Sequence, residues 1–269
     1  MYDAGARLWT KNDLVDIERQ LEQSASLDRF TLKCLDGTVV QVKNPFFGYW
    51  TLVQENFDGP QEMQYCSYFI DWKHQLARDF RGNVEDWMRL FEMKRRLWME
   101  SISCESFKRQ IGQILTANPG VNKVVCFGLG DMARRPPEVT ELGPGEKKGE
   151  PPKYIQKSDG DEVHAQMIQH AAALTIVEEI RCLHGQTGGD SVRLLTQDPQ
   201  YTDDTKALLR SKGFEIMGDF GAGGFGEVDD DCIVFSAWVS EPIKQIVADL
   251  APPAGFITLA NPNPFNRFK

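Results

Sequence analysis

Five short apolar segments after residue 120 alternate with helix-forming stretches, and this pattern restricts the possible fold more than any other feature of the sequence. The segments are residues 123–127, 192–196, 214–217, 232–238 and 256–260. They are continuously apolar and lack the alternation of a sheet with one face in water, so we expect both faces of their sheet to be covered. Short strands separated by helices are typical of α/β proteins with a parallel sheet.

The connections between these segments predict the order of the strands. A strong helical pattern runs from Asp161 to Leu183, a second helix follows the capping residue Thr202 and ends at Gly213, and a third starts at Ser240. The connection between the third and fourth strands is too short for a full helix. We therefore expect a Rossmann-like, doubly wound, mostly parallel five-stranded sheet, in the order 3-2-1-4-5.

The first 120 residues have a different pattern and are expected to pack on this sheet as an α+β region. Leu14, Ile17 and Leu21 predict a helix capped by Asn12 or Asp13. Two β-prone runs around Asp36-Gly37 predict a hairpin, and one long helix is expected from Val84 to Thr116.

These patterns divide the chain into an N-terminal region, residues 1–120, and a Rossmann-like domain, residues 121–269. Residues 134–160 are rich in Pro, Gly, Lys and Glu, which predicts a mobile surface insert in that domain.

Composition narrows the classes of partner. The net charge of −9 argues against broad nucleic-acid binding, which needs a basic surface. The sequence has no run of 18 apolar residues, so no membrane span is expected, and the first ten residues lack the pattern of a secretory signal. The six cysteines include no CxxC pair, which favours free thiols, no metal site, and a cytoplasmic or nuclear location.

Candidate binding residues follow the strands of the predicted sheet. In such folds, ligands bind beyond the carboxyl ends of the strands, where the strand order reverses. Glycines after the first strand let a ligand approach the backbone, and an acid after the second can accept hydrogen bonds from ribose hydroxyls. The expected binding residues are Gly128, Gly130, Asp131, Asp198, Tyr201, Trp238 and Glu241. Asp198 has an equally good structural interpretation, as the cap of the turn into the next helix.

The glycine motifs are incomplete as dinucleotide fingerprints. Gly128-Leu129-Gly130 lacks the third glycine that opens the next helix, which argues against ordinary NAD(P) binding. Residues 221–226 match GxGxxG literally, but they precede a strand, so a flexible turn is the better interpretation.

Catalytic candidates are few, and the sequence leaves open whether the protein is an enzyme. Ser236 could act as a nucleophile if a base lay beside it, although a small residue at the edge of the site is the simpler interpretation. His170 could be a catalytic base, or a packed and hydrogen-bonded core residue. Asp229, Asp230 and Asp231 are better explained as a solvated turn than as a metal cluster.

With these residues in view, the chain resembles the Sensitivity-to-Red-light-Reduced (SRR-like) domain family in its fungal form. The segments that carry the resemblance are residues 124–130, 169–174, 195–201 and 242–246, with residues 2–21 similar to the N-terminal lead of fungal members. The resemblance implies a Rossmann-like domain and a regulatory role. Plant members are associated with light signalling and the circadian clock, and a yeast member with microtubule stability.

The family has no established reaction. Many members carry Pro-His-Cys at the fourth strand, where this chain has Ser236-Ala237-Trp238. Chemistry that depends on that histidine is therefore not implied for this protein.

Four functional hypotheses follow. The first is a regulatory protein that binds a nucleotide-like or other small polar ligand in a Rossmann-type cleft, with protein partners as a further expectation. The second is an S-adenosylmethionine-dependent methyltransferase, since a strand-one GxG followed by an acid suits that cofactor better than NAD. The third is another group-transfer enzyme with Ser236 as acceptor, and the fourth is a pure interaction protein.

Overall fold

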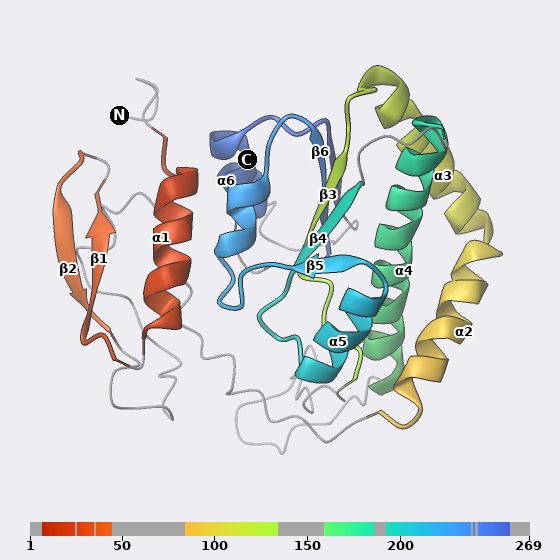
Figure 1. Cartoon of the computed structure of the whole chain (residues 1–269), viewed down its shortest axis with the longest axis horizontal. Helices are drawn as coiled ribbons and strands as arrows, with labels where there is room; N and C mark the ends of the chain where they lie inside the picture. Colours follow the sequence, from red (N-terminus) through yellow and green to blue (C-terminus); the bar gives the residue numbers. More distant parts are fainter. Residues whose placement is uncertain are drawn as a thin grey trace, which may run out of the picture.

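The computed structural model is a layered α/β molecule with a central sheet and helices on both sides (Figure 1). It describes residues 7–24, 26–34, 36–44, 84–133, 159–185, 192–237, 239 and 242–258. No helix in these ranges has the length and apolar character needed to cross a membrane.

The central sheet confirms the predicted topology. Its strands are β3 (Lys123–Phe127), β4 (Arg193–Gln197), β5 (Phe214–Ile216), β6 (Cys232–Ser236) and β7 (Gly255–Thr258). All four neighbouring pairs are parallel, and the order is β5-β4-β3-β6-β7, which is the 3-2-1-4-5 order expected from the sequence. The chain therefore reverses its direction of winding between β3 and β6, which places the topological switch point at the carboxyl ends of those two strands.

In the described parts of the chain, four helices cover one face of the sheet. They are α2 (Trp87–Met99), α3 (Ile102–Ala117), α4 (Asp159–Leu183) and α5 (Asp203–Ser211). Alternate strand residues, such as Val124 and Cys126 of β3, pack in one core cluster with Ile111 of α3 and Ile176 of α4. The α2 and α3 helices thus share a hydrophobic core with the sheet.

The prediction of one long helix from Val84 to Thr116 is wrong. The chain forms α2 and α3 instead, because Ser101 adopts an extended conformation between them and its Oγ accepts a hydrogen bond from Cys104 N at 3.1 Å. A serine at this position is a good helix cap, and it starts a new helix here without a proline or glycine.

On the other side of the sheet lie the short 3-10 helix η4 (Gly223–Glu227) and α6 (Ile243–Leu250). Beyond them lies α1 (Lys11–Glu22), and a hairpin of β1 (Arg29–Lys33) and β2 (Val39–Lys43) is outermost (Figure 1). Val125 and Phe127 of β3 point to this face and share a core cluster with Phe30 and Leu32 of the hairpin. The hairpin confirms the prediction around Asp36-Gly37. The short helix η4 lies in the connection between β5 and β6, which was expected to be too short for a full helix.

Three helix starts differ from those expected. The cap of α1 is Thr10, whose Oγ1 accepts a hydrogen bond from Asp13 N at 3.2 Å, so the assignment to Asn12 or Asp13 is wrong. The α4 helix begins at Asp159 and α6 at Ile243. The cap at Thr202 is confirmed, with a hydrogen bond from Thr205 N at 3.2 Å. The expected insert, residues 134–160, lies outside the described residues up to the start of α4.

Candidate functional site

The turns that follow β3 and β4 lie together at the carboxyl edge of the sheet. Gly128 N donates to the carbonyl oxygen of Gln197 at 3.0 Å, and Gly130 N donates to Asp198 Oδ2 at 2.6 Å. Gly128 and Gly130 have φ values of 67° and 80°, a conformation that glycine adopts without strain. These hydrogen bonds join the GLG turn to the Gln-Asp-Pro turn, as the sequence predicted.

Two buried carboxylates hold these turns in place. Besides its bond to Gly130, Asp198 accepts a hydrogen bond from Gln200 N at 2.9 Å through Oδ1. Asp131 accepts from Ala133 N at 2.8 Å and from Thr202 N at 2.6 Å. Each carboxylate therefore satisfies two backbone donors from the loops, and the turn-capping interpretation of Asp198 describes contacts that the structure contains.

His170, Tyr201 and Thr196 form a buried hydrogen-bond network beneath these turns. His170 Nδ1 lies 2.8 Å from the carbonyl oxygen of Gln166, and Nε2 lies 2.9 Å from the Tyr201 hydroxyl. That hydroxyl is 2.8 Å from Thr196 Oγ1. Since a carbonyl only accepts, His170 carries its proton on Nδ1, Tyr201 donates to Nε2, and Thr196 donates to Tyr201.

Burial sets the protonation states in this network. It lowers the pKa of His170 to about 4, which keeps the imidazole neutral near pH 7. It also raises the pKa of the Tyr201 hydroxyl well above its ordinary value, and the nearby Asp198 raises it further. The packed, hydrogen-bonded alternative for His170 matches these contacts, and a catalytic role for it stays a prediction.

Gln166 of α4 packs directly on the GLG turn. A Cβ atom built on Gly130 would lie 2.4 Å from Gln166 Cγ and 2.6 Å from its Nε2, so only glycine allows this contact. The Gln166 residue is 8% exposed, and its Nε2 donates to Glu162 Oε1 at 3.3 Å. Its Oε1 is buried and has no hydrogen-bond partner within the described parts of the chain. A buried acceptor left unpaired costs free energy, so this atom calls for an explanation.

Ser236 ends β6 beside the start of the GLG turn. It is paired in register with Phe127, and Ala237 N donates to the carbonyl oxygen of Phe127 at 3.0 Å. The residue is 3% exposed. Two other expected binding residues, Trp238 and Glu241, lie outside the described residues.

The structure thus brings Gly128, Gly130, Asp131, Asp198 and Tyr201 together, with His170 and Ser236 alongside. Sequence reasoning missed Gln166, whose only signal was its spacing of one helical turn from His170. It also missed Gln197, because the role of this residue depends on contacts with a loop distant in the sequence.

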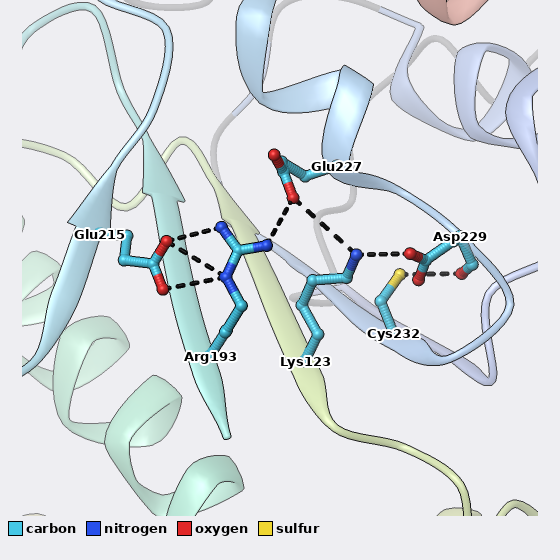
Figure 2. Close-up of polar contacts among 6 residues, drawn as sticks. All are labelled: Lys123, Arg193, Glu215, Glu227, Asp229 and Cys232. Atoms are coloured by element: carbon cyan, nitrogen blue, oxygen red, sulfur yellow. Dashed lines mark hydrogen bonds and ion pairs between the residues drawn. The ribbon is translucent and has the colours of Figure 1, made fainter. Parts of the chain in front are cut away.

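The opposite, amino edge of the sheet carries a network of charges instead (Figure 2). Lys123 Nζ lies 2.5 Å from Asp229 Oδ2 and 3.9 Å from Glu227 Oε2. Arg193 contacts Glu215 at 2.6 Å and Glu227 at 2.9 Å, and its hydrogen bonds hold the pKa of Glu215 below the usual value. Each cation in this network has acidic partners within the chain. The charges are therefore accounted for without an external ligand.

Asp229 and Cys232 at this edge bear on possible metal or thiol chemistry. Asp229 belongs to the acidic run interpreted as a turn, and it is engaged by Lys123. The Cys232 thiol donates to the carbonyl oxygen of Asp229 at 3.0 Å, and burial raises its pKa to about 11, so it is protonated near pH 7. Across the described residues there is no group of three or more His, Cys, Asp or Glu side chains suited to a metal ion.

Comparison with known proteins relates the chain to a protein family. A family model of the SRR1 domain matches residues 103–240, just over half of the chain, from α3 to the end of β6 and the residues after it. No curated protein and no solved structure matches the chain significantly. The matched region contains the GLG turn, the Gln-Asp-Pro turn and the α4 residues described above.

Proposed function

We propose that this chain, which belongs to the SRR1 domain family, is a regulatory protein that binds a small polar, nucleotide-like ligand at the carboxyl edge of its sheet. Family membership supports the regulatory role. The topology supports the location, since the edge beside β3 and β6 is the switch point at which open α/β sheets bind ligands.

The observation that carries the ligand proposal is the Gln166 side chain. Its buried Oε1 is an acceptor without a partner among the described residues, and it belongs to a residue packed on Gly130. A ligand hydroxyl or amino group that donated to this oxygen would remove the cost of the unpaired acceptor. Ribose hydroxyls and nucleobase amino groups are donors of this kind.

In this proposal the two carboxylates have a supporting role. Asp198 and Asp131 fix the turns through backbone amides, and the ligand contacts the glycine backbone and the Gln166 amide. A direct contact from either carboxylate to the ligand stays a prediction. Replacing Asp198 would disturb the turn itself, so it is a poor test of binding.

The test is calorimetric titration of the full chain with a panel of nucleotides and S-adenosyl compounds, repeated on Gln166→Met. Methionine keeps the length of the side chain and removes the amide. We expect one compound to bind the wild type and to bind Gln166→Met at least tenfold more weakly. The variant should be as stable as the wild type, because it no longer buries an unpaired acceptor.

Thr205→Val is the matched control. Thr205 of α5 is fully buried and its Oγ1 also has no partner among the described residues. The substitution should preserve stability in the same way and leave ligand affinity unchanged. Equal binding by wild type and Gln166→Met, or no binding by any compound, would contradict the proposal. Selective binding of S-adenosyl compounds would instead favour the methyltransferase alternative.

The location of the protein in the cell also stays a proposal. We propose a cytoplasmic or nuclear protein. The cysteines that the structure describes are free thiols, and four of them, Cys34, Cys104, Cys126 and Cys232, are buried, which suits a reducing compartment.

A further inference from the structure

The glycine-rich loop between β5 and η4 surrounds a carboxylate from the N-terminal helix. Glu18 of α1 accepts hydrogen bonds from three backbone amides of this loop. Phe220 N donates to Oε1 at 2.8 Å, and Ala222 N and Gly223 N donate to Oε2 at 2.8 and 3.0 Å. The Ala222 and Gly223 amides are successive, whereas the Gly221 amide between them and Phe220 donates to the carbonyl oxygen of Gly218 at 3.4 Å. Backbone amides of one turn that converge in this way form an arrangement that binds anions.

The glycines of the loop are needed for this arrangement. Gly221 has a φ of 96°, and a Cβ atom on Gly223 would lie 3.1 Å from Glu18 Cγ. Gly224 packs on Gln197 at the end of β4, where its added Cβ would lie 2.7 Å from Oε1. The literal GxGxxG motif therefore forms an anion site of a different kind from a dinucleotide loop, with no α-helix N-terminus behind it.

We propose that the loop from Phe220 to Gly223 is an oxyanion site that Glu18 occupies from within the chain, and that a free carboxylate or phosphate group binds the same amides when Glu18 is withdrawn. Glu18 is only half-buried, and residue Phe220 is 36% exposed. The site thus borders solvent, and an anion can reach it without unfolding the sheet.

This site would couple anion binding to the docking of α1. Glu18 and an external oxyanion cannot occupy the same three amides, so a ligand that binds the loop must loosen the helix that carries Glu18. By the same linkage, docking of α1 weakens the binding of an external anion to the loop amides. The proposal does not depend on a ligand at the GLG turn.

The test compares Glu18→Ala with the wild type and with Glu22→Ala, which removes an exposed carboxylate from the same helix. Thermal unfolding is followed in formate, in inorganic phosphate and in chloride at equal ionic strength. We expect Glu18→Ala to lower the Tm by several degrees in chloride. Formate should recover a large part of that loss, whereas the wild type and Glu22→Ala should respond to formate as they do to chloride.

Amide resonances locate the bound anion. In Glu18→Ala, formate or phosphate should shift the amide signals of Phe220, Ala222 and Gly223 saturably, and the response to each anion shows which oxyanion class fits. If the variant does not fold in chloride, the same comparison is made on refolding, where formate should restore the folded fraction. Equal behaviour in formate, phosphate and chloride, or shifts spread over the whole protein, would overturn the proposal.

Discussion

Asp198 holds two backbone amides that belong to different turns, and this double contact makes the residue sensitive to a change of one atom. In Asp198→Asn, one acceptor oxygen becomes an NH₂ group that faces the N–H of Gly130 or Gln200. A buried donor is then left unpaired, which costs about 1–3 kcal/mol. We expect the free energy of unfolding, measured in urea, to fall by this amount.

The control for this substitution is Asp219→Asn. Asp219 contacts Lys206 at 2.6 Å, but its side chain is 61% exposed, so its loss should change the free energy of unfolding by less than about 0.5 kcal/mol. Equal stabilities of the two variants would show that the Asp198 carboxylate does not fasten the turns.

His170 makes stability depend on pH below neutrality. Its folded-state pKa is about 4 against an ordinary value of 6.5, so between these pH values the unfolded chain binds a proton that the folded chain does not. The contribution of His170 to the free energy of unfolding is therefore fully present above about pH 6.5, and it is lost as the pH falls toward 4. The full effect is about 3 kcal/mol.

The measurement is urea unfolding of the wild type and of His170→Gln at a series of pH values from 7 down to about 4. The variant should be less stable at pH 7, because the network with Tyr201 is changed, but its stability should decline less steeply with acid. His184→Gln, at the exposed end of the same helix, should retain the wild-type slope. A variant of His170 with the wild-type slope would rule out this origin of the acid sensitivity.

At the scale of elements, the break between α2 and α3 depends on one side chain. Ser101→Ala removes the Oγ that accepts from Cys104 N, and loss of a serine cap costs about 1 kcal/mol. Ser103→Ala, two residues further and exposed, should leave stability unchanged or raise it slightly, since alanine is the better helix former. Urea unfolding of the two variants distinguishes a cap from an ordinary helical serine.

The elements that could be predicted from sequence are those whose evidence is local. Apart from Lys123 at the start of β3 and Ser236 at the end of β6, both segments are apolar and rich in β-branched residues, so their pairing in a buried parallel sheet follows from their composition. The division of the helix at Ser101 has no proline or glycine to mark it. It depends on a serine that could equally well lie inside a helix.

The candidate site divides in the same way. The meeting of the GLG turn with Asp198 could be predicted, because it follows from parallel strand order alone. The contact between Gln166 and Gly130, and the one between Glu18 and Gly223, could not. Each joins residues that are far apart in the sequence, and a glutamine or glutamate on a helix is ordinarily a solvated side chain.

At the scale of the molecule, the N-terminal region completes the core of the matched domain. The SRR1 match begins in α3, yet α1 and the hairpin, which precede it in the sequence, extend the core cluster on one side of its sheet, with α1 packed on η4 (Figure 1). Asp249 of α6 accepts hydrogen bonds from Leu8 N and Trp9 N at 2.7 and 3.3 Å, which ties the residues before α1 to α6. From this packing we expect the two regions to unfold together.

Leu32→Ala in β1 tests that cooperativity. Leu32 is fully buried in the cluster that contains Val125 and Phe127 of β3, so its truncation should lower the free energy of unfolding by about 2–5 kcal/mol. Because the cluster spans both regions, hydrogen exchange should accelerate at the amides of β3 and of β1 by the same factor.

Val39→Ala is the control, since this neighbouring hairpin residue is 61% exposed and its truncation should leave exchange in β3 unchanged. If Leu32→Ala accelerated exchange in the hairpin alone, residues 1–120 would contain a unit that unfolds separately from the sheet. That result would favour an independent N-terminal domain. A common factor in both regions would instead mean that the N-terminal helix and hairpin unfold with the sheet whose core cluster they share.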